Sequence, residues 1–96
     1  HAQIDMALDY GINFMDTAEM YSVPISADTY GLTEAYIGTW LAKNRAKRDK
    51  WILATKVAGP SGRLNWVRNG QLRLDRQNIT QALHDSLRRL QTDTID

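Results

Sequence analysis

The chain has 96 residues, of which 43% are hydrophobic and 24% are charged, a balance typical of a folded globular domain. Twelve Lys and Arg stand against 11 Asp and Glu, so the net charge of +1 gives no general attraction to nucleic acid or to an anionic membrane surface. No cysteine is present, which excludes disulfides and thiolate metal sites, and two isolated histidines predict no metal centre. The absence of cysteine fits a cytoplasmic protein. No apolar run approaches the roughly 20 residues of a membrane span, so no membrane role is expected.

The first predicted elements are a helix and a strand. Residues 2–10 place apolar side chains at helical spacing, and Gly11 stands where a helix commonly ends in a left-handed residue. Residues 12–17 follow at once and are rich in large apolar side chains, as in a buried parallel strand. Asp16 therefore falls at the carboxyl end of the first predicted strand.

A second helix and strand follow a loop that contains Pro24 and Gly31. Thr33 can cap a helix that runs toward Asn44. Residues 51–57 then predict a second strand, which ends in a lysine that a strand interior would not tolerate. Lys56 is therefore expected near the edge or mouth of a sheet.

The last third of the chain predicts a long loop, a helix and the opening of another strand. Residues 58–77 contain several turn formers, and the length of this loop favours a functional role. Asn78 and Gln81 can form a capping box for an amphipathic helix. Its apolar stripe comprises Ile79, Ala82, Leu83, Ser86, Leu87 and Leu90. With residues 95–96 as a strand start, the order of elements predicts an α/β fold of parallel β/α units.

Four segments, taken in order, carry a resemblance to a known family. They are residues 10–21 (YGINFMDTAEMY), 30–38 (YGLTEAYIG), 54–57 (ATKV) and 86–93 (SLRRLQTD). Together they resemble the aldo-keto reductases, in which a strand delivers an aspartate, a tyrosine follows five residues later, and the next strand carries a lysine. The similarity covers nearly the whole chain.

The resemblance implies a fold and an activity. Residues 1–96 would be the N-terminal portion of a single (β/α)8 TIM barrel domain, ending just before the strand that carries the family's catalytic histidine. The complete barrel would use NADPH to reduce the carbonyl group of a small aldehyde or ketone. The family's main cofactor-binding loops would also lie beyond this chain.

The resemblance also assigns three catalytic residues. Tyr21 would be the general acid that protonates the carbonyl oxygen as hydride arrives. A free phenol holds its proton too tightly for neutral pH, so the ammonium of Lys56 would ease the proton transfer. Asp16 would hold Lys56 in place and keep it charged in a partly desolvated site, and it would also be a cofactor-binding residue.

Each of these residues has an ordinary interpretation when it is taken alone. Asp16 is as often a helix cap or a turn residue, Tyr21 a half-buried aromatic, and Lys56 a surface lysine. The ordered set favours the catalytic interpretation. Among the tryptophans, Trp66 in the long loop is the best placed to face a ligand, whereas Trp40 and Trp51 are expected in the core.

A second hypothesis concerns the 96 residues taken by themselves. A barrel of this type needs about 250 residues. The isolated segment would then be a non-catalytic fragment that exposes sheet edges and one sheet face, and it would need the remainder of the barrel or self-association to cover them.

Overall fold

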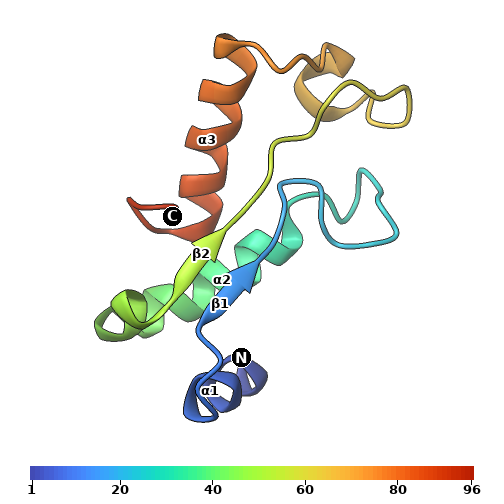
Figure 1. Ribbon diagram of the computed structural model, residues 1–96. Helices are drawn as coiled ribbons and strands as arrows, with labels where there is room; N and C mark the ends of the chain where they lie inside the picture. The colour runs from blue at the N-terminus through green and yellow to red at the C-terminus, as the bar shows by residue number, and fades with distance from the viewer.

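The computed structural model describes residues 1–96 and contains two strands between three α-helices (Figure 1). In chain order the elements are α1 (Ala2–Asp9), β1 (Phe14–Asp16), α2 (Leu32–Lys43), the 3-10 helix η1 (Arg45–Lys50), β2 (Ile52–Ala54), the 3-10 helix η2 (Val67–Gly70) and α3 (Arg76–Leu90). The two strands pair in parallel, with Phe14 opposite Ile52 and Asp16 opposite Ala54. The predicted parallel β/α units are therefore confirmed.

The two strands send their following loops to the same end of the molecule. In Figure 1 the arrows of β1 and β2 point the same way, and the two long loops that follow them lie beyond the arrowheads. Helix α1 lies at the opposite end, and α2 crosses behind the strands. Residues just after β1 and just after β2 are thus neighbours in space, although about 40 positions separate them in the sequence.

The strands are shorter than the predicted ranges 12–17 and 51–57, although pairing continues beyond them. The Thr17 amide donates to the carbonyl of Ala54 (2.9 Å), and the Glu19 amide donates to the carbonyl of Lys56 (3.2 Å). At the chain's end, the Asp96 amide donates to the carbonyl of Leu53 (2.9 Å). Because Leu53 points its backbone away from β1, residues 95–96 run along the other edge of β2, as expected for the opening of a third strand.

Two predicted helix starts are wrong. Helix α2 begins at Leu32 directly after Gly31, which has φ +80°, so Thr33 lies inside the helix and does not cap it. A glycine in the left-handed region turns the chain here without any side-chain cap. The predicted end of the first helix is confirmed, because Gly11 follows α1 with φ +84°.

Helix α3 begins three residues earlier than the predicted capping box implies. Asp75 is the N-cap residue, and its carboxylate accepts from the backbone amide of Asn78 (2.9 Å) and from its side-chain amide (3.0 Å). Asn78 and Gln81 therefore form no capping box. The Asp75 carboxylate is a stronger cap than the neutral Asn78 side chain would be, because it binds a free N–H group of the first helical turn with a negative charge.

The main hydrophobic core lies between α2, one face of the strands and the C-terminal end of α3. Trp40 and Trp51 are buried at its centre, as predicted, with their rings edge to face at 6.4 Å. The remaining buried members are Ile37, Leu41, Leu53 and Leu90. Along α3 the buried line is Ala82, Ser86 and Leu90, so the predicted inward stripe is wrong at Ile79 and Leu83, which are 43% and 42% exposed.

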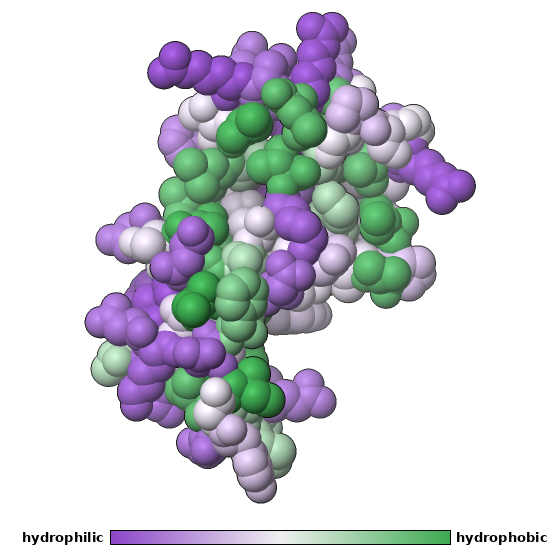
Figure 2. Space-filling view, in the orientation of Figure 1, coloured by the Kyte–Doolittle hydropathy of each residue, from purple (hydrophilic) through white to green (hydrophobic).

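The other face of the sheet is uncovered. Phe14 and Ile52, which pair across the two strands, are 56% and 45% exposed, and Ile12 is also exposed. Figure 2 shows hydrophobic side chains reaching the surface in the middle of the molecule, between polar groups at its ends. Large apolar side chains on a sheet face are normally covered, so this face is suited to packing against further chain.

Candidate active site

The three predicted catalytic residues meet at the carboxyl end of the strands. Asp16 is the last residue of β1, and Lys56 lies two residues beyond β2. Side chains alternate between the faces of a strand, so Asp16 shares the uncovered face with Phe14, and Lys56 shares it with Ile52. Two carboxyl ends of parallel strands thereby bring a carboxylate and an ammonium to one mouth.

Lys56 is held by two oxygen atoms. Its Nζ donates to Oδ2 of Asp16 at 2.8 Å and to the backbone carbonyl of Thr17 at 2.9 Å. The hydrogen bond to Asp16, helped by the negative charge of that carboxylate, raises the pKa of Lys56 above its ordinary value, although partial loss of solvent acts in the opposite direction. The lysine is therefore a fixed cation at neutral pH.

Tyr21 lies against this cation. The Nζ atom of Lys56 is 5.1 Å from the centre of the Tyr21 ring, within the range of a cation–π contact. Tyr21 is half-buried at the end of the short segment that leaves β1, residues 17–21. An ammonium, a carboxylate and a phenol are thus gathered within one small region.

The ion pair is only partly removed from solvent. The side chains of Asp16 and Lys56 are 57% and 46% exposed, because the sheet face on which they lie has no covering layer. An exposed ion pair of this kind contributes only about 0–1 kcal/mol to folding. The ion pair therefore contributes little to the stability of the fold.

A buried ion pair beside the site was missed at the sequence level. Glu19 is fully buried, and its Oε1 lies 2.6 Å from a terminal nitrogen of Arg68, whose side chain is only 7% exposed. The same guanidinium donates through Nε to Asn78 Oδ1 (2.9 Å) and through its second terminal nitrogen to the carbonyl of Ala58 (3.3 Å). A glutamate between Ala18 and Met20 was the only signal, and nothing in the sequence indicated its partner.

A second buried pair lies behind the sheet. Oε2 of Glu34 on α2 is 2.6 Å from Nε of Arg89 on α3, and the Thr55 hydroxyl donates to the other oxygen of Glu34 (2.6 Å). This pair ties two helices to the end of β2. The side chain of Glu34 is hydrogen-bonded to Arg89 and Thr55, and to no residue of the segment 17–21 that carries Tyr21.

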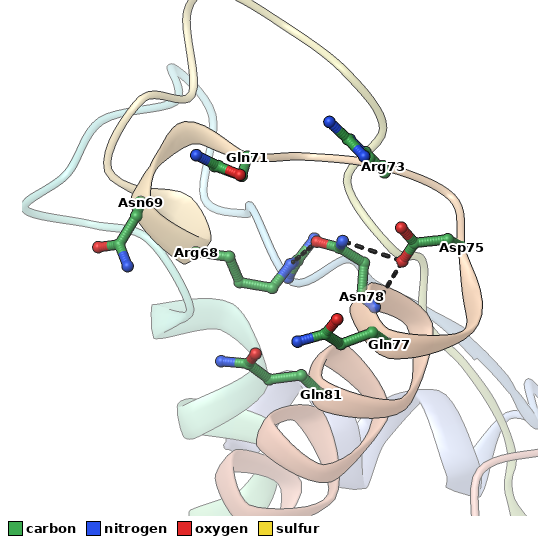
Figure 3. A pocket seen from close by; sticks show the side chains of 8 residues that line it. All are labelled: Arg68, Asn69, Gln71, Arg73, Asp75, Gln77, Asn78 and Gln81. Carbon is green, nitrogen blue, oxygen red and sulfur yellow. Dashed lines mark hydrogen bonds between the residues drawn. The ribbon is translucent and has the colours of Figure 1, made fainter.

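A polar hollow of about 320 Å³ lies between the long loop and α3 (Figure 3). Arg68 and Asn78 line it, but Asp16, Tyr21 and Lys56 do not. The other predicted ligand-facing residue, Trp66, is half-buried and packs against the loop's own apolar cluster. The hollow is therefore distinct from the mouth of the strands.

The model of the aldo/keto reductase family matches residues 1–96, the whole chain. The chain belongs to the aldo/keto reductase family. It is 54% identical over 96 residues to protein tas of Escherichia coli strain K12 and spans 28% of the length of that protein. It is 40% identical over 93 residues to the 6-dehydroglucose reductase of Novosphingobium aromaticivorans, of which it also covers 28%.

A solved structure supports the same assignment. A structure described as an aldo-keto reductase of Pseudomonas aeruginosa superposes on 99% of this chain with a TM-score of 0.69 and 28% identity, and the chain covers 30% of it. The fold is accordingly part of the aldo-keto reductase TIM barrel. None of the helices is long and apolar enough to cross a membrane.

Proposed function

We propose that residues 1–96 form the N-terminal portion of one barrel domain that reduces the carbonyl group of an aldehyde or ketone with NADPH. The observation that carries this proposal is the position of the Lys56 ammonium, held between the carboxylate of Asp16 and the ring of Tyr21 at the ends of two parallel strands. Barrel enzymes build their active sites at this end. Family membership supports an oxidoreductase, and the name of the Novosphingobium relative supports reduction.

The residues at the mouth fit a cofactor that carries hydroxyl groups. Oδ2 of Asp16 is bound to Lys56, whereas Oδ1 has no hydrogen-bond partner in the protein and the side chain is 57% exposed. Asp16 can therefore hold Lys56 and also accept a hydrogen bond from a cofactor hydroxyl. NADPH, when bound, supplies the hydride.

The chain's own residues supply the proton and its electrostatic support. The Tyr21 hydroxyl donates its proton to the carbonyl oxygen as the carbonyl carbon accepts hydride, so the product is an alcohol and Tyr21 becomes a phenolate. The Lys56 ammonium stabilises that negative charge. Asp16 keeps Lys56 charged and aimed at the ring through the 2.8 Å hydrogen bond.

Replacing Tyr21 by phenylalanine in the complete protein tests this proposal. Tyr21→Phe removes only the proton donor, so the turnover of a carbonyl substrate should fall by about 10²- to 10⁴-fold while NADPH binding is retained. Tyr36→Phe is the matched control, because Tyr36 is 63% exposed on α2, away from the mouth. An equal loss of nucleotide binding and turnover would contradict the role of Tyr21.

The fragment hypothesis applies to a polypeptide of these 96 residues alone. The uncovered apolar face at Phe14 and Ile52 favours it, as does the 28% share of each relative that the chain spans. Such a polypeptide would lack catalytic activity and would bind the remainder of the barrel or another copy of itself. Cytoplasmic localisation stays a prediction from composition.

A further inference from the structure

The segment that carries Tyr21 is fixed from two sides. On the strand side, the Glu19 amide donates to the carbonyl of Lys56, and Lys56 in turn binds the carbonyl of Thr17. On the other side, the Glu19 side chain reaches Arg68 in the long loop, 49 positions further along the chain. Glu19, two residues before Tyr21, is thus held by the loop as well as by the sheet.

The carboxylate of Glu19 depends on this one contact. Arg68 binds Oε1, whereas Oε2 is buried without a hydrogen-bond partner. Two charges that are both removed from water at 2.6 Å strongly favour the paired geometry, because an unpaired buried charge is costly. The pair therefore resists any displacement of residue 19 from the loop.

Arg68 is itself held in a demanding conformation. Its backbone has φ 44° and ψ 44°, and Asn69 follows with φ 61°, both in the left-handed region that side chains other than glycine seldom adopt. Such conformations persist where the surroundings determine them. Figure 3 shows the Arg68 side chain running from η2 to Asn78 on α3, which is bound in turn to the cap residue Asp75.

Apolar contacts act in the same direction. Met20, between Glu19 and Tyr21, packs against the loop cluster of Ala58, Leu64, Val67 and Leu72. Both residues immediately before Tyr21 are therefore anchored in the long loop, one by charge and one by packing. Tyr21 is the next residue outward, and it lies against Lys56.

We propose that the buried Glu19–Arg68 pair is a positioning device that couples the long loop to the active site by holding Tyr21 against Lys56. This inference rests on the proposed role of Tyr21 as proton donor. Glu19 and Arg68 are positioning residues, because neither side chain is hydrogen-bonded to Lys56 or Tyr21. A displacement of the loop would be transmitted to the phenol through Glu19.

The test compares two buried glutamates in the complete protein. Glu19→Gln removes the charge that pairs with Arg68, and Glu34→Gln makes the same change at the other buried Glu–Arg pair, which has the same 2.6 Å separation. Both variants should lose stability. Only Glu19→Gln should lower kcat per folded molecule, by roughly 10- to 100-fold, since a shift on the order of 1 Å in a catalytic group has effects of this size. NADPH affinity should stay within about twofold, and the solvent deuterium isotope effect on kcat should increase.

A second readout does not depend on turnover. Backbone amide exchange of residues 17–22, measured by mass spectrometry, should speed up at least fivefold in Glu19→Gln and should be unchanged in Glu34→Gln. If Glu19→Gln does not fold, Arg68→Lys replaces it in the test, because lysine keeps the charge but loses the forked contacts to Asn78 and Ala58. Arg68→Lys should then show the lower kcat and the faster exchange of residues 17–22 relative to Glu34→Gln.

The outcomes separate this inference from the proposed function. Equal effects of Glu19→Gln and Glu34→Gln on kcat per folded molecule, or unchanged exchange of residues 17–22 in Glu19→Gln, would overturn the positioning role while leaving Tyr21 as the donor. If Tyr21→Phe is as active as the parent protein, the proposed function fails. In that case the exchange comparison alone decides whether Glu19 holds the segment.

Discussion

The contact between α2 and α3 gives the sharpest test of the packing, at Gly38. A Cβ atom added there would lie 2.0 Å from the carbonyl oxygen of Arg89 and 2.9 Å from the carbonyl carbon of Leu90. Both obstacles are backbone atoms, which cannot rotate away. Since non-bonded heavy atoms rest about 3.5 Å apart, Gly38→Ala would require the two helices to separate by roughly 1.5 Å.

This separation should outweigh the better helix propensity of alanine. Ala favours a helix over Gly by about 1 kcal/mol. Overpacking costs typically about 1–3 kcal/mol. The same shift would pull Arg89 from Glu34, one turn before Gly38 on α2, and leaving this buried carboxylate poorly paired costs about 1–3 kcal/mol more. We therefore expect a net loss of about 2 kcal/mol or more in the free energy of unfolding.

Urea unfolding of the complete protein, followed by tryptophan fluorescence, measures this loss. Trp40 and Trp51 lie in the core that the helix contact closes, so their emission reports the transition. Gly62→Ala is the matched control, since a Cβ there meets nothing within 4 Å, and its effect should stay within about 0.5 kcal/mol. A Gly38→Ala protein as stable as the control would refute the close approach of the helices.

Three further predictions follow from the charges and the uncovered face. Because Asp16 raises the pKa of Lys56 above 10.5, the stabilisation from their pair is complete below that pH and is lost as the pH rises through the raised pKa. The urea midpoint should therefore fall less steeply between about pH 8 and 11 in Asp16→Asn than in the parent protein. Equal falls of the midpoint in the two proteins would count against the pair. Asp75→Ala should lower the urea midpoint more than Asp75→Asn, which keeps a cap acceptor. The hydrogen bonds from Asn78 lower the pKa of Asp75, so the contribution of its charge to stability should be present above pH 3.8 and lost as the pH falls through the lowered pKa. An identical loss of stability in acid for Asp75→Asn and the parent protein would contradict this. A polypeptide of residues 1–96 should self-associate at micromolar concentration or give weak near-ultraviolet circular dichroism from its three tryptophans. A monomer that melts cooperatively and gives strong near-ultraviolet tryptophan signals would contradict the fragment hypothesis.

The elements and the meeting of the site residues could be predicted because they depend on local patterns. A short apolar run that ends in a charged residue indicates a strand and its carboxyl end, and parallel pairing then brings Asp16 and Lys56 to one mouth. The boundaries of the helices were harder to predict. Thr33 and Asn78 are both reasonable N-caps by residue type, yet the N-cap residues are Gly31 for α2 and Asp75 for α3. Several residues of a suitable type lie near each boundary, and the tertiary fold selects among them.

The Glu19–Arg68 pair could not be predicted from the sequence. The partners are 49 positions apart, and the approach requires a left-handed backbone at Arg68, which no propensity favours for arginine. The exposure of Ile79 and Leu83 has a related cause. Their spacing on α3 marks an apolar face, but spacing does not indicate which neighbour covers it.

The site and the barrel interior are subject to a single constraint, the register of β1 on β2. Phe14 lies opposite Ile52, and two positions further Asp16 lies opposite Ala54, so the face that would fill the barrel is also the face that carries the ion pair. Side chains alternate with a period of two, so inserting one residue before Phe14 would turn the carboxylate of Asp16 toward the helices and leave Lys56 without its partner. The same insertion would turn Phe14 to the helix side, where Trp51 and Leu53 already fill the core. Packing of the interior therefore opposes this shift, because the change of register that separates Asp16 from Lys56 also disrupts the hydrophobic core.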